Sequence, residues 1–301
     1  MVLYKFAQFV RRPRNAVIVC GMVTAGVFCI KATPHVFPAK VYRPFVVAYK
    51  GGLEMPLSTS QTSEFYEVCS RIGVNSNTYH PFVTSRWEIG SRGLAWLPNG
   101  VQFGLPAILT NDPDLSAKRF SEPIKKADKE VSESFLNALC LSESARKFAI
   151  AREIFKIKRN ATAFLVLLAP AVTAVNFCGV FAAHVFVPLP LITNIPVVGV
   201  FFFILYQFMM GVTNEREDFT ADEKVSQLGE EYVRGGVEFY EKAIQKNIAL
   251  RKIMGRRGEK MYTYYGNETA GLTYSSGANN TQKRDKLKKK LEFITKAKAE
   301  L

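Results

Sequence analysis

Two cations and a glutamate stand where a zinc peptidase carries its metal motif. Arg152, Glu153 and Lys156 have the spacing of H-E-x-x-H, in which two histidines four residues apart share one helix face and bind zinc. Asp218 and Asp222 follow later in the chain, where an acidic third ligand would come. Arginine stays protonated and lysine ordinarily does, so neither coordinates Zn²⁺. We therefore expect no metal, no cofactor and no catalytic residue here.

The same residues predict a different kind of site. Asp218 and Asp222 are natural salt-bridge partners for Arg152 and Lys156, and such a cluster would replace the metal as the link between two helices. An ordinary polar helix face is the alternative interpretation of this segment. Distinguishing the two requires the elements that position the residues.

A long uncharged stretch separates the two halves of the constellation. Residues 160–214 contain no Asp, Glu, Lys or Arg. Within them, residues 161–187 and 195–213 are each apolar and long enough to span a bilayer. Residues 16–37 form a third candidate span. A membrane hairpin returns the chain to the side it came from, so the helix that begins after Ser142, a good N-cap, can pack against the region 214–267.

Residues 38–158 are expected to form a soluble α+β region that ends in the degenerate motif. A helix is predicted at 61–72 and strands at 79–87 and 101–109, with Pro106 limiting the second strand to an edge or a bulge. A polar, exposed insertion is expected at 112–131. The two strands suggest a groove that takes an extended partner segment by strand addition, with five candidate side chains: Tyr79, Phe82, Val101, Phe103 and Leu105.

The charge distribution points to membranes. The formal net charge is +14, and no acidic residue precedes Glu54. Residues 1–15 are basic and typical of a mitochondrial targeting segment, although the n-region of a secretory signal is the alternative. Residues 268–301 are expected to form a flexible loop and a basic tail. The tail is either a solvated helix or a contact for anionic lipid, and no nucleic-acid motif accompanies its lysines, Lys286, Lys288, Lys289 and Lys290.

Cysteine usage adds a further limit. The chain has five cysteines and no C-x-x-C pair, which argues against a disulfide framework or a zinc ribbon. Buried free thiols are the simpler expectation.

Several separated runs resemble the transmembrane protein 177 family of the mitochondrial inner membrane. The most specific is Gly-Gly-Val-Glu-Phe-Tyr-Glu-Lys at 235–242, and others lie at 72–74, 80–82, 145–153 and 258–263. The resemblance implies a non-enzymatic role in cytochrome c oxidase (complex IV) biogenesis, in which the protein stabilises newly made subunit II and the inner-membrane chaperone that handles it. It carries over no catalytic residue.

The order of helix, hairpin and helix also resembles membrane gluzincins of the CAAX prenyl protease type, from which the chain departs at Arg152 and Lys156. We expect a mainly α membrane protein with a small β element, three transmembrane helices and an α+β domain like a pseudo-metallopeptidase. The alternative function is a membrane-embedded protease with an altered active site around Glu153, Asp218 and Asp222. The side of the membrane that the domain faces stays open, because the acid-free N-terminus and the basic residues at 156–159 favour opposite orientations.

Overall fold

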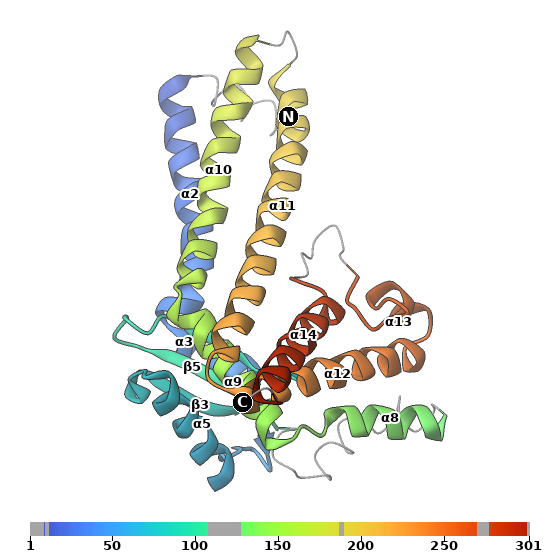
Figure 1. The fold of residues 1–301 in the computed structure, drawn as a ribbon. Coiled ribbons are helices and arrows are strands. Elements are labelled where there is room, and N and C mark those ends of the chain that lie inside the picture. The colour runs from blue at the N-terminus through green and yellow to red at the C-terminus, as the bar shows by residue number, and fades with distance from the viewer. Residues whose placement is uncertain (1–8, 10–11, 108–127, 187–189, 270–276, 300–301) are drawn as a thin grey trace.

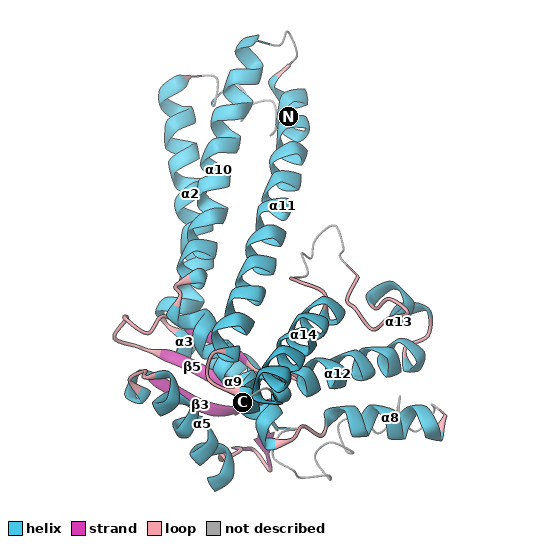
Figure 2. Ribbon diagram, in the orientation of Figure 1, coloured by secondary structure: helices cyan, strands magenta, loops and turns pink. Residues whose placement is uncertain are grey.

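Three long helices rise from a domain of helices and two small sheets (Figures 1 and 2). The computed structural model describes residues 9, 12–107, 128–186, 190–269 and 277–299. The long helices are α2 (Pro13–Val36), α10 (Ala161–Phe186) and α11 (Leu191–Ser226). All three are long and apolar enough to cross a membrane, which confirms the predicted number of spans. Most of the predicted insertion at 112–131 and most of the segment 1–15 lie outside the described residues.

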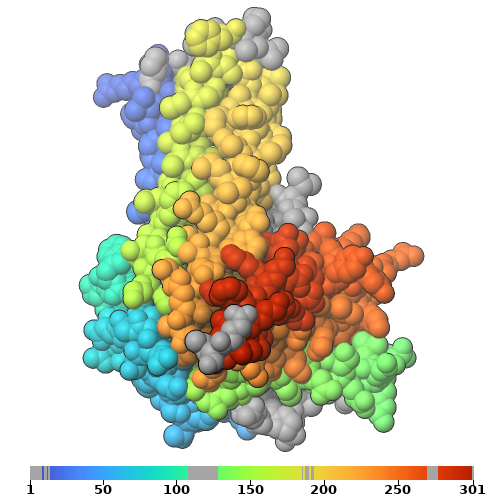
Figure 3. Space-filling view, in the orientation of Figure 1, coloured from blue at the N-terminus to red at the C-terminus, as the bar shows by residue number. Residues whose placement is uncertain are grey.

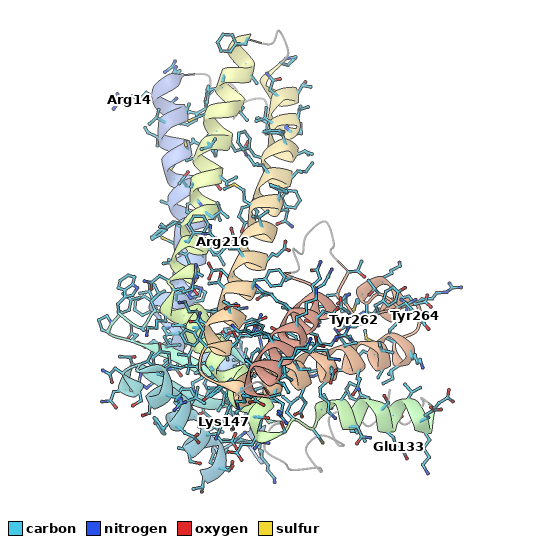
Figure 4. All side chains as sticks on the ribbon, viewed as in Figure 1. Arg14, Glu133, Lys147, Arg216, Tyr262 and Tyr264 are labelled. Atoms are coloured by element: carbon cyan, nitrogen blue, oxygen red, sulfur yellow. The ribbon has the colours of Figure 1, made fainter. Side chains whose placement is uncertain are left out.

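The three long helices form a layer in which α10 lies between α2 and α11 and contacts both. The pairing with α11 is close, because a side chain on Gly179 would meet the Phe202 ring at 2.7 Å. At 36 residues, α11 is about 54 Å long, which exceeds the roughly 30 Å of a bilayer core. Its charged end, from Glu215 onward, therefore continues into the domain. Figure 4 shows Arg14 at the far end of α2 from the domain and Arg216 at the domain end of α11.

The main sheet has three strands in the order β3-β5-β4. Strand β5 (Val101–Pro106) pairs in parallel with β3 (Tyr79–Thr84) and antiparallel with β4 (Gly90–Gly93). The prediction that Pro106 confines its strand to an edge or a bulge is wrong. Strand β5 is central, and Pro106 is tolerated because it is the last residue of the strand, opposite Thr84. A separate hairpin joins β1 (Tyr49–Lys50) to β2 (Leu53–Glu54).

The interior of the domain is built on β3 and β5. Helix α5 (Thr59–Ile72) covers them, with the Phe65 ring 5.0 Å from that of Phe103. It begins two residues before the predicted start, with a capping box between Ser58 and Gln61, and it ends at left-handed Gly73, the predicted stop. The five side chains expected to line a groove are each at most 3% exposed. They lie in the core and line no open groove, which corrects the expectation of a partner-binding groove. The five residues are Tyr79, Phe82, Val101, Phe103 and Leu105.

Helices complete the domain. Helix α9 (Glu143–Lys158) runs into the membrane hairpin and packs against α12 (Glu230–Ile253). Helix α14 (Asn280–Ala299) also packs on α12, and in the space-filling view it lies over the domain end of α11 (Figure 3). This part of the expected flexible tail is therefore an ordered helix with Leu287 in the core. The remaining elements are η1 (Ser76–Thr78), α3 (Pro38–Val41), α4 (Arg43–Val46), α8 (Lys129–Leu139) and α13 (Arg256–Met261).

Candidate functional site

The degenerate motif forms a buried ionic cluster where α9 meets the lower end of α11. Arg152 donates from Nη2 to Asp218 Oδ1 at 2.5 Å and from Nε to Asp222 Oδ1 at 2.9 Å. Lys156 donates from Nζ to the same Asp218 oxygen at 2.5 Å. The two positions that hold histidines in H-E-x-x-H thus converge on one carboxylate of the following helix. Four of the five residues predicted from spacing lie in direct contact.

Glu153 does not join these ion pairs. Successive residues of an α-helix are about 100° apart, so Glu153 leaves α9 in a different direction from Arg152. Its Oε1 accepts a hydrogen bond from Ser91 Oγ on β4, at 2.6 Å. The side chain that would activate water in a zinc peptidase instead links α9 to the sheet.

Two further residues complete the cluster, and the sequence analysis missed both. Tyr240 on α12 donates to the Asp222 carboxylate, with its hydroxyl 2.8 Å from each oxygen. Lys283 on α14 donates to Asp218 Oδ2 at 3.2 Å, and its Nζ lies 5.0 Å from the centre of the Tyr240 ring. Tyr240 belongs to the specific run at 235–242, which was a usable signal. Lys283 had no such signal, because it lies in the segment expected to be a tail.

The carboxylate oxygens of the cluster are all occupied by donors from within the cluster. Both oxygens of Asp218 and both oxygens of Asp222 accept at least one hydrogen bond. Asp218, Asp222 and Lys283 are all buried. Within the described part of the chain, no group of three or more His, Cys, Asp or Glu side chains is placed to hold a metal ion.

Burial shapes the protonation of these groups. It lowers the pKa of Lys283, and the positive charge of Arg152 adds to the effect. It raises the pKa of Tyr240 well above the ordinary value, so the phenol stays a neutral donor to Asp222. Burial alone would lower the pKa of Arg152, but its anionic surroundings hold that pKa well above the ordinary value. The arrangement is suited to holding four helices together.

Two glycines bring Tyr240 to the cluster. A Cβ on Gly235 would lie 2.3 Å from the carbonyl oxygen of Ser144, and one on Gly236 would lie 2.5 Å from the Phe148 ring. Only glycine permits α12 to approach α9 this closely. At the same crossing, Glu238 accepts from the backbone N–H of Ser142 at 3.0 Å. The run at 235–242 is therefore a helix-packing motif that ends in a cluster residue.

A cleft of about 420 Å³ opens beside the cluster, where the membrane hairpin enters the domain. Its walls include Arg152 and Lys156 of the cluster, Leu165 of the first turns of α10, and Asn214 of α11. Glu153 lines the same space. The cleft therefore joins the charged cluster to the apolar base of the hairpin.

Most of the lysines proposed as a lipid-contacting tail face the protein. Lys288 pairs with Glu241 at 2.6 Å, and Lys290 pairs with Glu223 at 2.7 Å. Lys286 lies 5.1 Å from the centre of the Phe219 ring, while Lys289 is exposed. Much of the charge along α14 therefore holds that helix on the domain.

Fold and cluster together define the class of protein. It is a mainly helical multi-pass membrane protein with small sheets, in which buried ion pairs link the helix before a membrane hairpin to the helix after it. The chain belongs to the transmembrane protein 177 family. It is 34% identical over 279 residues to transmembrane protein 177 of Homo sapiens and 32% identical over 276 residues to that of Mus musculus, with 88% of both chains covered in each case.

A more distant relative covers still more of the chain. Transmembrane protein 177 of Xenopus laevis is 28% identical over 308 residues, which are 96% of this chain and 97% of the relative. No protein-family model matches the sequence. No solved structure matches it either.

Proposed function

We propose that this protein is a non-enzymatic assembly factor of the mitochondrial inner membrane that supports cytochrome c oxidase biogenesis. In this role it stabilises newly made subunit II together with the inner-membrane chaperone that handles it. The observation that carries the non-enzymatic part is the saturation of the cluster, in which Arg152 and Lys156 occupy the ligand positions. Membership of the transmembrane protein 177 family supports the assembly role, which the sequence resemblance implies.

The architecture suits a protein that holds a membrane client. Three candidate spans present apolar faces within the bilayer, and in the candidate span that begins at Thr193 none of the most apolar stretch is buried by the rest of the chain. The ionic cluster fixes the hairpin to the domain directly below those faces. A client with its own membrane helix can thus contact the spans and the domain together.

A pulse-chase of mitochondrial translation products tests the assembly role. The tagged protein is captured from mild-detergent extracts at successive chase times, and a tagged inner-membrane carrier protein serves as the control. Selective, transient enrichment of new subunit II is the expected result. Absence of enrichment, with subunit II turnover unchanged after depletion of the protein, contradicts the proposal.

The second candidate is a membrane-embedded protease that uses Glu153, Asp218 and Asp222. The cleft favours it, because Glu153 and Asp218 both line a space that reaches the membrane. Zinc analysis of the purified protein, together with Glu153→Gln in depleted cells, separates the two functions. An assembly factor keeps subunit II levels with Glu153→Gln and carries no stoichiometric zinc. Bound zinc, with loss of function in this variant, supports the protease.

A further inference from the structure

The end of α2 is fastened to the sheet at the base of the membrane layer. The backbone N–H of Gly93 donates to His35 Nδ1 at 3.4 Å, and Asn99 Nδ2 donates to the carbonyl oxygen of Val36 at 2.7 Å. In the same turn, Trp96 Nε1 donates to Asn160 Oδ1 at 3.2 Å, immediately before α10 begins. The segment 93–99 therefore bridges the points where two candidate spans leave the bilayer. Exposed Trp96 is placed as aromatic residues are at a membrane interface.

Two arginines share one aromatic ring beside this junction. The Cζ atoms of Arg86 and Arg92 lie 5.7 Å and 5.5 Å from the centre of the Tyr42 ring. Both arginines are exposed, and neither has a carboxylate partner among the described residues. The three residues, Tyr42, Arg86 and Arg92, are called the arginine–tyrosine patch below.

Tyr42 is 6% exposed, and its hydroxyl has no hydrogen-bond partner in the described part of the chain. Burial raises the pKa of this phenol above its ordinary value, so it stays protonated and able to donate. A buried polar group without a partner costs free energy. Arg92 Nη1 donates to the carbonyl oxygen of Ser91 at 2.8 Å, so the patch combines two guanidinium groups that lack a carboxylate partner with a buried, unused hydroxyl donor.

The surroundings of the patch are predominantly cationic. Lys40 on α3 is exposed and forms no ion pair with the described residues. Arg43 pairs with Glu54 at 2.5 Å, which neutralises both groups. Glu153 is the acidic group that acts on Tyr42, and it is held by the hydroxyl of Ser91. The neighbouring helices expose apolar rings, with Phe37 49% and Phe45 83% accessible.

We propose that the arginine–tyrosine patch binds the phosphate of an anionic phospholipid in the leaflet next to the domain. Guanidinium groups bind phosphate oxygens through paired, charge-assisted hydrogen bonds, and the patch holds two of them beside one ring. Phe37 and Phe45 then enter the interfacial layer beside the bound headgroup. Charge complementarity and the position at the ends of α2 and α10 favour a lipid over an acidic protein segment. The patch is independent of the proposed assembly role.

The experiment uses the full chain in nanodiscs of phosphatidylcholine with a minor fraction of phosphatidylglycerol. Lipids that remain on the protein after its release are identified by native mass spectrometry. Wild-type protein is expected to retain phosphatidylglycerol in preference to phosphatidylcholine. Arg86→Gln/Arg92→Gln should lower that preference roughly 25-fold, because each basic residue near an anionic surface contributes about a factor of five.

A matched control removes two other exposed arginines. Arg256→Gln/Arg257→Gln changes the net charge equally, on helix α13 at the far side of the domain (Figure 1), and should keep the preference for phosphatidylglycerol. Equal retention by the patch variant and wild type overturns the proposal. An equal loss in the α13 control shows a general charge effect and also overturns it. A second arm adds either inorganic phosphate or phosphatidylglycerol to lipid-free protein in detergent and measures the midpoint of thermal unfolding. If phosphate raises the midpoint as much as phosphatidylglycerol does, the site binds a free anion and the lipid proposal is rejected.

Discussion

The ionic cluster and the arginine–tyrosine patch use the same kinds of residue differently. In the cluster, Arg152 lies within 6.0 Å of the Tyr240 ring centre and donates to two carboxylates. In the patch, Arg86 and Arg92 lie at similar distances from Tyr42 and meet no carboxylate of the described chain.

This difference separates structural charge from charge available for binding. A buried charge with one partner removed costs several kcal/mol, so a saturated cluster fixes the helices that supply it. Exposed charges of one sign contribute little to folding and attract a partner of the opposite sign. The comparison predicts large stability effects in the cluster and small ones in the patch.

The largest effect is expected from Arg152→Met. This change leaves buried Asp222 without its cation and removes one of the three cations on Asp218, so it should lower the free energy of unfolding by about 3–5 kcal/mol. Thermal unfolding of the purified protein in detergent measures the loss. Lys288→Met is the control, since that ion pair with Glu241 is exposed, and it should cost at most about 1 kcal/mol. Equal losses in both variants would show that the cluster does not hold the fold.

The cluster itself was largely predictable from sequence. The spacing of Arg152 and Lys156, together with Asp218 and Asp222 after an uncharged hairpin, predicted contacts that the structure contains. The spans and the helix start at Ser142 followed from apolar length and capping chemistry. These signals are local, or depend only on a hairpin returning the chain to its starting side.

The missed features depend on tertiary packing. Lys283 reaches Asp218 only because α14 packs on α12, and a run of lysines carries no sign of that docking. The central position of β5 follows from the order in which strands pair, which its residues do not encode locally. Arg86 and Arg92 both reach the ring of Tyr42, which a distant part of the chain supplies.

Tyr240→Phe is expected to give the second-largest effect. It keeps the ring beside Arg152 and Lys283 but removes the hydroxyl that donates to Asp222. Hydrogen bonds to charged groups contribute about 1.5–3 kcal/mol, and thermal unfolding should show a loss in that range. Tyr264→Phe is the control, because it alters an exposed phenol and should leave the midpoint of thermal unfolding unchanged. If Tyr240→Phe is as stable as the wild type, the hydrogen bond from Arg152 alone is sufficient for the Asp222 carboxylate.

Gly235→Ala tests the helix approach that delivers Tyr240. The added methyl group would meet the backbone of Ser144 at 2.3 Å, so α12 must move away from α9. Overpacking of this kind costs about 1–3 kcal/mol. Gly199→Ala is the control, because its Cβ meets nothing within 4 Å, and stability should be kept or slightly increased. A stable Gly235→Ala protein with an intact cluster would show that the close approach is not required.

The smallest stability effect is expected from Arg86→Gln/Arg92→Gln in lipid-free detergent, where the midpoint should shift by less than the equivalent of about 0.5 kcal/mol. Phosphatidylglycerol should then stabilise wild-type protein but not this variant, since only a bound ligand adds to the stability of the folded state. Arg152→Met should show the reverse pattern, with low intrinsic stability and an intact response to the lipid. If the patch variant is as unstable as Arg152→Met without lipid, its arginines hold the fold, and the contrast between the two regions is lost.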